Sequence, residues 1–129
     1  MNNSDILFTK AKEASQKAYA PYSKFKVGCA ILASSGNIYS GCNVENVSYP
    51  VGTCAEAGAI AAMVNGGDKK ISAVLVYADS NSLISPCGAC RQRIAEFADS
   101  STIVYLADAQ GIQKSISIEE LLPLNFKEF

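Results

Sequence analysis

Three cysteines in two short phrases constrain the fold of this chain more than any other feature. Cys54 stands two residues before Glu56, and Cys87 and Cys90 form a C-x-x-C pair further along. Three thiolates leave the fourth corner of a tetrahedral zinc ion open, and a catalytic zinc needs that corner for water. Glu56 can then carry protons instead of binding the metal. The sequence therefore predicts a fold that brings both phrases together around one zinc ion.

The absence of histidine excludes a large class of enzymes. The chain contains no histidine at all, and serine and cysteine hydrolases of the usual kind need an imidazole base. Any zinc must therefore be held by sulfur and oxygen alone. Proton transfer near neutral pH must fall to another titratable side chain, such as a carboxylate.

Length and charge narrow the class of protein further. The 129 residues, of which 49% are hydrophobic, suit one packed domain spanning residues 1–129. The net charge of −1 and the lack of a basic run argue against nucleic acid as a partner. No apolar run approaches the roughly 20 residues that span a bilayer, so no membrane association is expected.

The N-terminus and the cysteine count indicate a compartment. Residues 1–5 (MNNSD) have neither the basic start nor the apolar stretch of a secretory signal. Five cysteines is an odd number, which in a reducing compartment favours metal binding or catalysis over disulfides. We therefore expect a cytoplasmic protein.

Apolar periodicity and turn residues predict helices that alternate with strands. A first helix, capped by Ser4 or Asp5, should end before Pro21. Two further helices should begin near Cys54 and Cys87, with a short helical turn at 119–122. The expected strands are 26–33 and 38–41, which form a hairpin, and then 71–78, 102–107 and 113–118. This order indicates a layered α/β domain with a mixed sheet.

Both cysteine phrases thus fall at predicted helix starts. Helix N-termini present unpaired N–H groups and partial positive charge, which lower the pKa of a thiol and offset the charge of three sulfurs. The loop 43–53, directly before the first phrase, is rich in polar and aromatic side chains. Loops on a rigid scaffold often hold binding residues.

Other interpretations of these residues stay open. Cys87 and Cys90 also resemble a redox dithiol at a helix start. A purely structural zinc site would take its fourth ligand from Cys29 or Cys42, although Cys29 lies in an apolar strand typical of a core. Glu56 taken alone would be an ordinary solvated carboxylate.

Five stretches of the chain together resemble one protein family. They are 19–28 (YAPYSKFKVG), 41–46 (GCNVEN) with Tyr49-Pro50, 54–56 (CAE), 85–92 (SPCGACRQ) and 120–123 (ELLP). In order and spacing they are similar to the small, single-domain cytidine deaminases. The resemblance covers nearly the whole length of the chain.

This resemblance implies a fold, a cofactor and a reaction. The fold is a three-layer α/β/α sandwich with a mixed, roughly five-stranded sheet. Cys54, Cys87 and Cys90 would bind one Zn²⁺ per subunit, and Glu56 would shuttle protons. The reaction would be the hydrolytic deamination of cytidine and deoxycytidine to uridine and deoxyuridine with release of ammonia, a step of pyrimidine salvage.

The resemblance also implies substrate contacts. Asn43 and Glu45 would hydrogen-bond the sugar 3′-hydroxyl, Phe25 would pack against the pyrimidine, and Ala55 would belong to the same substrate-binding set. Phe126 looks like the aromatic residue that reaches into a neighbouring subunit's site, because relatives with three cysteine ligands are usually homotetramers with shared sites. Without the flanking match, the two aromatics would be packing residues and the two polar residues an ordinary turn.

Two other functions stay open beside this one. The first is deamination of a modified aminopyrimidine nucleoside such as blasticidin S, by relatives that match the nucleoside loop less well. The intact Asn43 and Glu45 favour an ordinary nucleoside. The second is a zinc-stabilised binding module without catalysis, which would have no need for a carboxylate at Glu56.

One departure from the family pattern concerns charge. Many relatives carry an arginine directly after the catalytic glutamate, where it neutralises part of the thiolate charge, whereas this chain has Ala57. Three thiolates on a divalent zinc ion sum to −1, and without compensation the zinc would be a weaker Lewis acid. We hypothesise that the helix N-termini, with Arg91 as a further candidate, supply the compensation.

Overall fold

Strand β3 (Ile71–Ala78) is the middle of the sheet because its side chains are almost all apolar and are buried on both faces. In the computed structural model, which describes residues 2–128, the strand order is β2-β1-β3-β4-β5. β1 (Val27–Ala33) lies antiparallel to β2 (Ile38–Cys42) and to β3. β4 (Ile103–Asp108) runs parallel to β3 and antiparallel to β5 (Gly111–Ser117). The predicted mixed, five-stranded sheet is confirmed.

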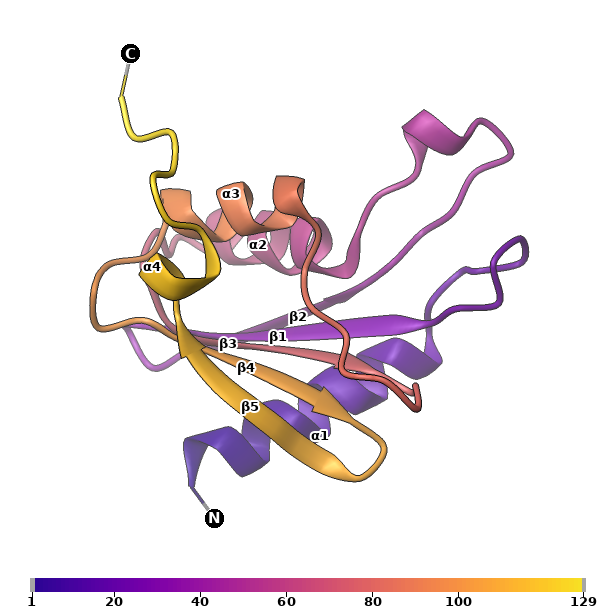
Figure 1. Cartoon of the computed structure of the whole chain (residues 1–129), viewed down its shortest axis with the longest axis horizontal. Coiled ribbons are helices and arrows are strands. Elements are labelled where there is room, and N and C mark those ends of the chain that lie inside the picture. The colour runs from indigo at the N-terminus through magenta and orange to yellow at the C-terminus, as the bar shows by residue number, and fades with distance from the viewer. Residues whose placement is uncertain (1, 129) are drawn as a thin grey trace.

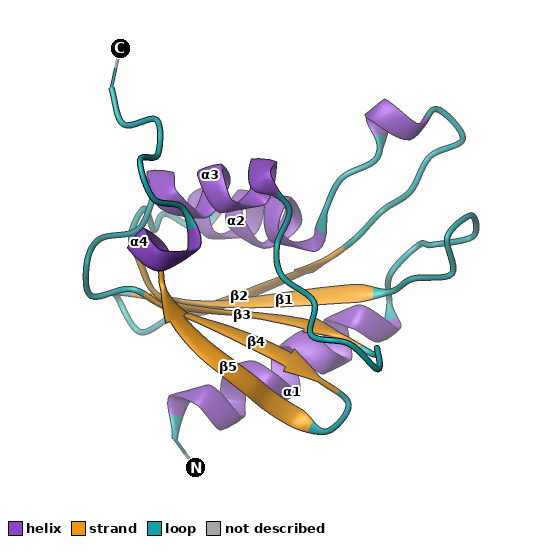
Figure 2. Ribbon diagram, viewed as in Figure 1, coloured by secondary structure: helices purple, strands orange, loops and turns teal. Residues whose placement is uncertain are grey.

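Helices cover both faces of this sheet (Figures 1 and 2). α1 (Asn3–Gln16) lies against one face, where it packs on β1 and β3. α2 (Ala55–Asn65) and α3 (Gly88–Glu96) lie on the opposite face, and the short α4 (Ile118–Leu121) contacts α3. The predicted three-layer α/β/α sandwich is confirmed. None of the helices in the described part of the chain is long and apolar enough to cross a membrane.

The strands lie within two residues of their predicted ranges and α1 ends before Pro21 as predicted, but its N-cap differs from the prediction. The N-cap is Asn2, whose side-chain oxygen accepts from the Asp5 N–H at 3.0 Å, so Ser4 and Asp5 are wrong as caps. The helix ends at Gln16 because the chain then extends and Tyr19 forms a β-bridge with the loop before α2. That loop also contains a 3₁₀ turn, η1 (Tyr49–Val51), which the sequence analysis did not predict.

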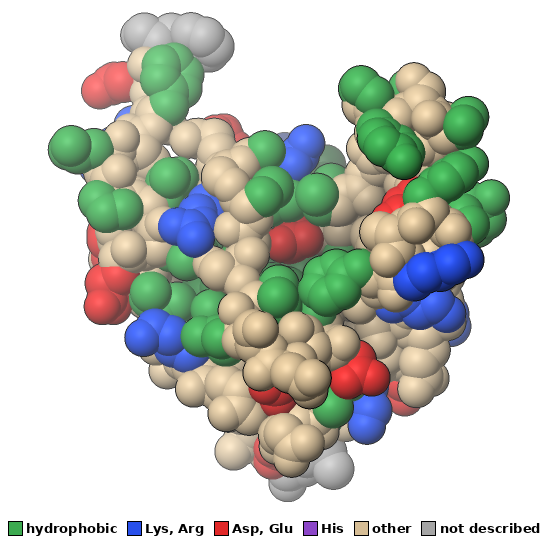
Figure 3. Space-filling view, turned by 45° about the vertical axis from the view of Figure 1, so that its right-hand side comes forward, with side chains coloured by type: hydrophobic (Ala, Val, Ile, Leu, Met, Phe, Trp, Pro, Cys, Tyr) green, Lys and Arg blue, Asp and Glu red, His purple; other side chains and the backbone are tan. Residues whose placement is uncertain are grey.

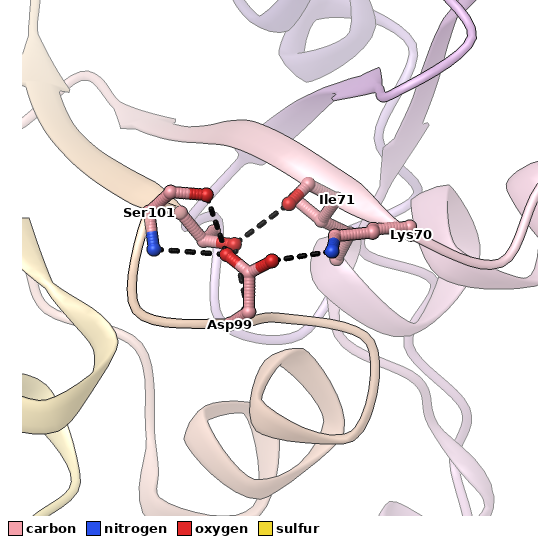
Figure 4. A network of polar contacts seen from close by, with 5 residues as sticks. Lys70, Ile71, Asp99 and Ser101 are labelled. Carbon is pink, nitrogen blue, oxygen red and sulfur yellow. Dashed lines mark hydrogen bonds and ion pairs between the residues drawn. The ribbon is translucent and has the colours of Figure 1, made fainter.

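A polar network fastens the loop after α3 to the start of β3 (Figure 4). The Thr102 hydroxyl donates to the Ile71 carbonyl at 2.7 Å and accepts from the Asp99 N–H at 3.0 Å. The Asp99 carboxylate pairs with Lys70 and accepts two hydrogen bonds from Ser101, and Lys70 holds the pKa of this carboxyl well below its usual range. The network thus fixes where the crossover through α3 returns to the sheet, as parallel strands require.

Helix α2 approaches β2 most closely at Gly41. A Cβ added to Gly41 would lie 2.4 Å from the Ala59 nitrogen and 2.8 Å from the Ala55 carbonyl oxygen, so only glycine fits there. The facing Gly58 on α2 is different, because a Cβ there would meet nothing nearer than 3.6 Å. The first turn of α2 carries the predicted catalytic carboxylate, Glu56. The close packing at Gly41 therefore determines the distance of this carboxylate from the sheet.

We expect Gly41→Ala to lower the free energy of unfolding by about 2 kcal/mol, because the helix must move away from the sheet to admit one methyl group. Gly58→Ala is the matched control: it should leave stability unchanged or raise it by up to about 1 kcal/mol, since alanine favours a helix interior. Urea unfolding followed by circular dichroism measures both. Equal midpoints for the two variants would contradict this account of the interface.

Candidate active site

The two cysteine phrases meet because α2 and α3 pack side by side with their N-terminal ends close together. Cys54 is the N-cap of α2, Cys87 is the N-cap of α3, and Cys90 lies in the first turn of α3. Their Sγ atoms all lie within 4.8 Å of one another. Sulfurs bound tetrahedrally at about 2.3 Å from zinc would be roughly 3.8 Å apart. The three sulfurs therefore fit a zinc ion after a small contraction.

The three thiols differ in acidity for identifiable reasons. Burial raises the pKa of Cys90 and, to a smaller extent, that of Cys54. The Cys87 thiol is exposed, and a hydrogen bond from the Cys90 backbone N–H lowers its pKa. A metal must therefore displace protons from the Cys90 and Cys54 thiols, which couples metal binding to proton release.

Glu56 lies beside the sulfurs without joining them. It stands in the first turn of α2, its side chain is 5% exposed, and burial raises its pKa. Its carboxylate is not among the atoms that group with the three sulfurs. The interpretation of Glu56 as an ordinary solvated carboxylate is therefore wrong, and the geometry leaves it available for proton transfer.

The remaining cysteines do not complete the metal site. Cys29 is fully buried in β1, and burial raises its pKa well above the usual value, so it stays a neutral core thiol. Cys42 ends β2. Within residues 2–128, neither of them joins the cluster. A structural zinc site with Cys29 or Cys42 as its fourth ligand is therefore not supported, and the convergence of three sulfurs also disfavours an isolated redox pair.

A cavity of about 590 Å³ opens onto the cluster, within the size range of small-molecule sites. Of the residues predicted from the sequence, its wall contains Phe25, Asn43, Glu45, Cys54, Ala55, Glu56 and Cys87. The loops before β1 and before α2 form an arm over it, and Figure 3 shows a notch in the surface with hydrophobic side chains gathered on its rim. The fold thus brings four predicted substrate residues to the sulfur cluster.

Asn43 has a structural role that the sequence analysis did not predict. Its side-chain oxygen accepts from the Val27 N–H at 2.9 Å, and its amide nitrogen donates to the Phe25 carbonyl at 2.8 Å. These bonds hold the segment that presents Phe25 to the cavity. An asparagine side chain can make further hydrogen bonds, so one acceptor and one donor position of Asn43 remain for a ligand.

Glu45 fastens the same segment from the other side. Its carboxylate accepts from the backbone N–H groups of Tyr22 and Ser23, both at 3.1 Å, and from the Ser23 hydroxyl. The Ser23 hydrogen bonds lower the pKa of Glu45, so it is ionised at neutral pH. A carboxylate can accept about four hydrogen bonds, which leaves one acceptor position toward the cavity.

Phe126 does not line the cavity of its own chain. Its side chain is 64% exposed on the C-terminal tail, which leaves the body beyond α4 (Figure 1). The Gln92 side chain donates to the Phe126 carbonyl at 2.9 Å and ties the tail to α3. The predicted reach of this aromatic ring into a neighbouring subunit's site stays a prediction.

Arg91, the candidate named in the hypothesis on Ala57, makes its hydrogen bonds to groups other than the sulfurs. Its guanidinium donates to the carbonyls of Pro86 at 2.9 Å and Leu121 at 2.7 Å and to the Ser85 hydroxyl at 2.8 Å. These bonds tie the start of α3 to α4.

The cation that reaches the sulfurs is Arg93, which the sequence analysis missed. Its Nη1 donates to the Cys90 Sγ at 3.4 Å. The available signal was spacing, because residues three apart on a helix are neighbours on its surface.

The sequence of this chain is similar to those of known cytidine deaminases. The family model for the cytidine and deoxycytidylate deaminase zinc-binding region matches residues 1–107, which include both cysteine phrases. The cytidine deaminase of Sporosarcina psychrophila is 45% identical over 122 residues, covering 95% of this chain and 90% of that protein. A blasticidin-S deaminase of Bacillus cereus is more distant, at 34% identity over 111 residues, covering 80% of this chain and 78% of that protein.

The fold comparison agrees with the sequence comparison. The crystal structure of cytidine deaminase from Burkholderia pseudomallei superimposes with a TM-score of 0.90 at 40% identity, covering 98% of this chain and all 100% of that one. Fold, cysteine phrases and near-complete coverage thus coincide. The chain belongs to the family of cytidine and deoxycytidylate deaminases defined by this zinc-binding region.

Proposed function

We propose that this protein catalyses the zinc-dependent hydrolytic deamination of cytidine and deoxycytidine, with uridine or deoxyuridine and ammonia as products. One observation carries the proposal: three sulfurs within 4.8 Å of one another border a cavity of about 590 Å³ beside the buried carboxylate of Glu56. Membership of the deaminase family supports it. We also infer that residues 1–129 act as a single catalytic domain.

In this proposal Cys54, Cys87 and Cys90 hold one Zn²⁺ per chain. Zinc held by three thiolates keeps a fourth position for water and lowers the pKa of that water toward neutrality. The chain contributes by leaving that position without a protein donor, since no fourth ligand joins the sulfurs in the described residues. It also places two helix N-termini at the sulfurs, where partial positive charge favours thiolates.

Glu56 is assigned the movement of protons. Its carboxylate accepts a proton from the attacking water and passes it to ring N3 of cytosine while the water oxygen bonds to C4. It then moves the proton of the new C4 hydroxyl to the departing amine, the C4–N bond breaks as the C4 carbonyl forms, and one water is consumed for each ammonia released. One carboxylate acts as base and acid, which is most efficient with a pKa near the working pH. Burial raises the pKa of Glu56 in that direction.

Glu56→Gln should keep the fold and the zinc content but lower kcat for cytidine by at least about a thousandfold, because an amide of the same size cannot accept the proton. The fall in ultraviolet absorbance of cytidine measures turnover, and atomic emission measures zinc per chain.

The matched control for this test is Glu13→Gln, which removes the same charge from an exposed position of α1 on the opposite face of the sheet. It should turn over cytidine like the wild type. Near-normal turnover by Glu56→Gln at full zinc occupancy would remove Glu56 from the mechanism.

The cavity wall supports a nucleoside as substrate. Phe25 offers an aromatic ring to the pyrimidine, and Asn43 and Glu45 keep free hydrogen-bonding positions for the 3′-hydroxyl. Ala55 is small and buried, and its backbone N–H belongs to the first turn of α2, where N–H groups have no intrahelical partner. We infer that these four residues bind the nucleoside.

Because the proposed sugar contacts are to the 3′-hydroxyl, kcat/KM for cytidine and deoxycytidine should differ by less than about a hundredfold, or 2.7 kcal/mol. The substrate 3′-deoxycytidine should lose at least about tenfold, since a polar group is left without its partner. Blasticidin S, in the same panel, should be a poor substrate. Rapid turnover of blasticidin S with slow turnover of cytidine would favour the alternative substrate class. No turnover of any compound by zinc-loaded protein would favour a non-catalytic binding module.

We infer that the protein is a homotetramer with shared active sites and acts on free nucleosides in the cytoplasm, in pyrimidine salvage. Large apolar side chains are exposed near the cavity and on the tail, including Val47 at 78%, Tyr49 at 75% and Phe126 at 64%. Such a concentration of exposed apolar side chains is typical of an interface. Three reactive thiols that must stay reduced suit a reducing compartment.

Shared sites predict complementation between two inactive variants. Phe126→Ala should leave zinc bound but lower kcat/KM by at least about tenfold, because it removes a large apolar contact from a neighbour's site. When Phe126→Ala and Glu56→Gln chains are coexpressed and purified through two different tags, some sites combine an intact Glu56 with an intact Phe126.

The mixed assembly should therefore exceed the summed activity of the two parent variants. Light scattering on the wild type measures the number of copies. A monomer in solution, or mixed assemblies with only additive activity, would contradict the shared site.

A further inference from the structure

Among the described residues, Arg93 is the cation whose side chain contacts the sulfur cluster. The Nη1–Sγ distance to Cys90 is 3.4 Å, suitable for a hydrogen bond to sulfur. The other arginine of α3, Arg91, donates its hydrogen bonds to Pro86, Ser85 and Leu121. Of the two arginines of α3, Arg93 is therefore the one that brings a full positive charge into contact with a sulfur of the metal site.

The site needs such a charge. Three thiolates and a divalent ion sum to −1, and an ionised Glu56 at 5% exposure adds a second negative charge. Two helix N-termini contribute only partial charges of about +0.5 each. The charge of Arg93 also lies near the other two sulfurs, because all three Sγ atoms lie within 4.8 Å of one another and Arg93 contacts one of them.

Helix geometry explains how an exposed arginine reaches a buried sulfur. Cys90 is fully buried in the first turn of α3, and Arg93 follows three residues later on the same side of the helix. Helical side chains lean toward the N-terminus, so the long arginine stem carries its guanidinium back over the preceding turn. The residue after Glu56 on α2 is Ala57, which has no charge to offer from the facing helix.

We propose that Arg93 is a positioning residue that orients the Cys90 ligand through its hydrogen bond to the sulfur and supplies from α3 the counter-charge that α2 lacks at Ala57. It acts through Cys90 and does not touch the nucleoside. This inference rests on the zinc site of the proposed function and adds to it the residue that sets the strength of metal binding. Loss of such a contact around a metal ligand typically weakens binding about 10- to 100-fold.

The test measures zinc affinity directly by competition with a chromophoric chelator at fixed pH and low ionic strength. Arg93→Gln should weaken zinc binding by about tenfold, at the low end because Arg93 is exposed. Arg93→Lys should restore most of the loss. In cobalt-loaded protein, the sulfur-to-cobalt absorption band should shift in Arg93→Gln and return in Arg93→Lys.

A double-mutant cycle tests whether an arginine at position 57 can supply the same counter-charge as Arg93. Ala57→Arg should change zinc affinity by less than about threefold in the wild type but recover most of the loss in the Arg93→Gln background, because one counter-charge suffices. Lys10→Gln removes the same charge from α1 on the far face of the sheet and should bind zinc like the wild type.

Three results would overturn the proposal. The first is a zinc affinity of Arg93→Gln within twofold of that of the wild type. The second is a loss of zinc affinity in Lys10→Gln as large as that in Arg93→Gln. The third is that Ala57→Arg raises zinc affinity equally in the wild type and in the Arg93→Gln background. Failure of the proposed function is distinguishable, because it would appear in the wild type as no zinc or no turnover of cytidine. Wild-type zinc binding and turnover with an unaffected Arg93→Gln would refute only the role of Arg93.

Discussion

The convergence of two helix N-termini on three sulfur atoms is the interaction on which the rest of this structure depends. α2 and α3 cross the same face of the sheet, and each begins at a cysteine that serves as its N-cap without a side-chain capping bond. The sulfur atoms thus lie where N–H groups and partial positive charge concentrate. Packing of α2 on β2 at Gly41 and of α3 behind β3 and β4 gives this convergence its fixed geometry.

The loops around the cavity combine structural and chemical roles in the same side chains. Asn43 and Glu45 both line the cavity and hold the segment 20–27 in place, and both keep hydrogen-bonding capacity for a ligand. A loop fixed in this way loses little freedom when a ligand binds, which lowers the entropic cost of recognition. Orientation of Phe25 and recognition of a sugar are therefore linked in one network.

Charge around the metal site illustrates how a fold can satisfy one requirement in different ways. The negative charge of three thiolates and a buried carboxylate must be offset by something nearby. Here α2 offers only Ala57, and α3 offers Arg93 through a helical turn that aims it at Cys90. A guanidinium can offset the thiolate charge from either helix, provided that it lies within hydrogen-bonding distance of a sulfur.

By itself the sequence determined the α/β class, the strand ranges, the grouping of Cys54, Cys87 and Cys90, and a carboxylate beside them. These follow from local periodicity and from the ligand number of zinc, both of which are written in neighbouring residues. Only the tertiary structure decided that Asn2 caps α1 and that Arg93 instead of Arg91 meets a sulfur. Those outcomes depend on which side chains face one another after packing, and two arginines two positions apart on one helix contact different neighbours.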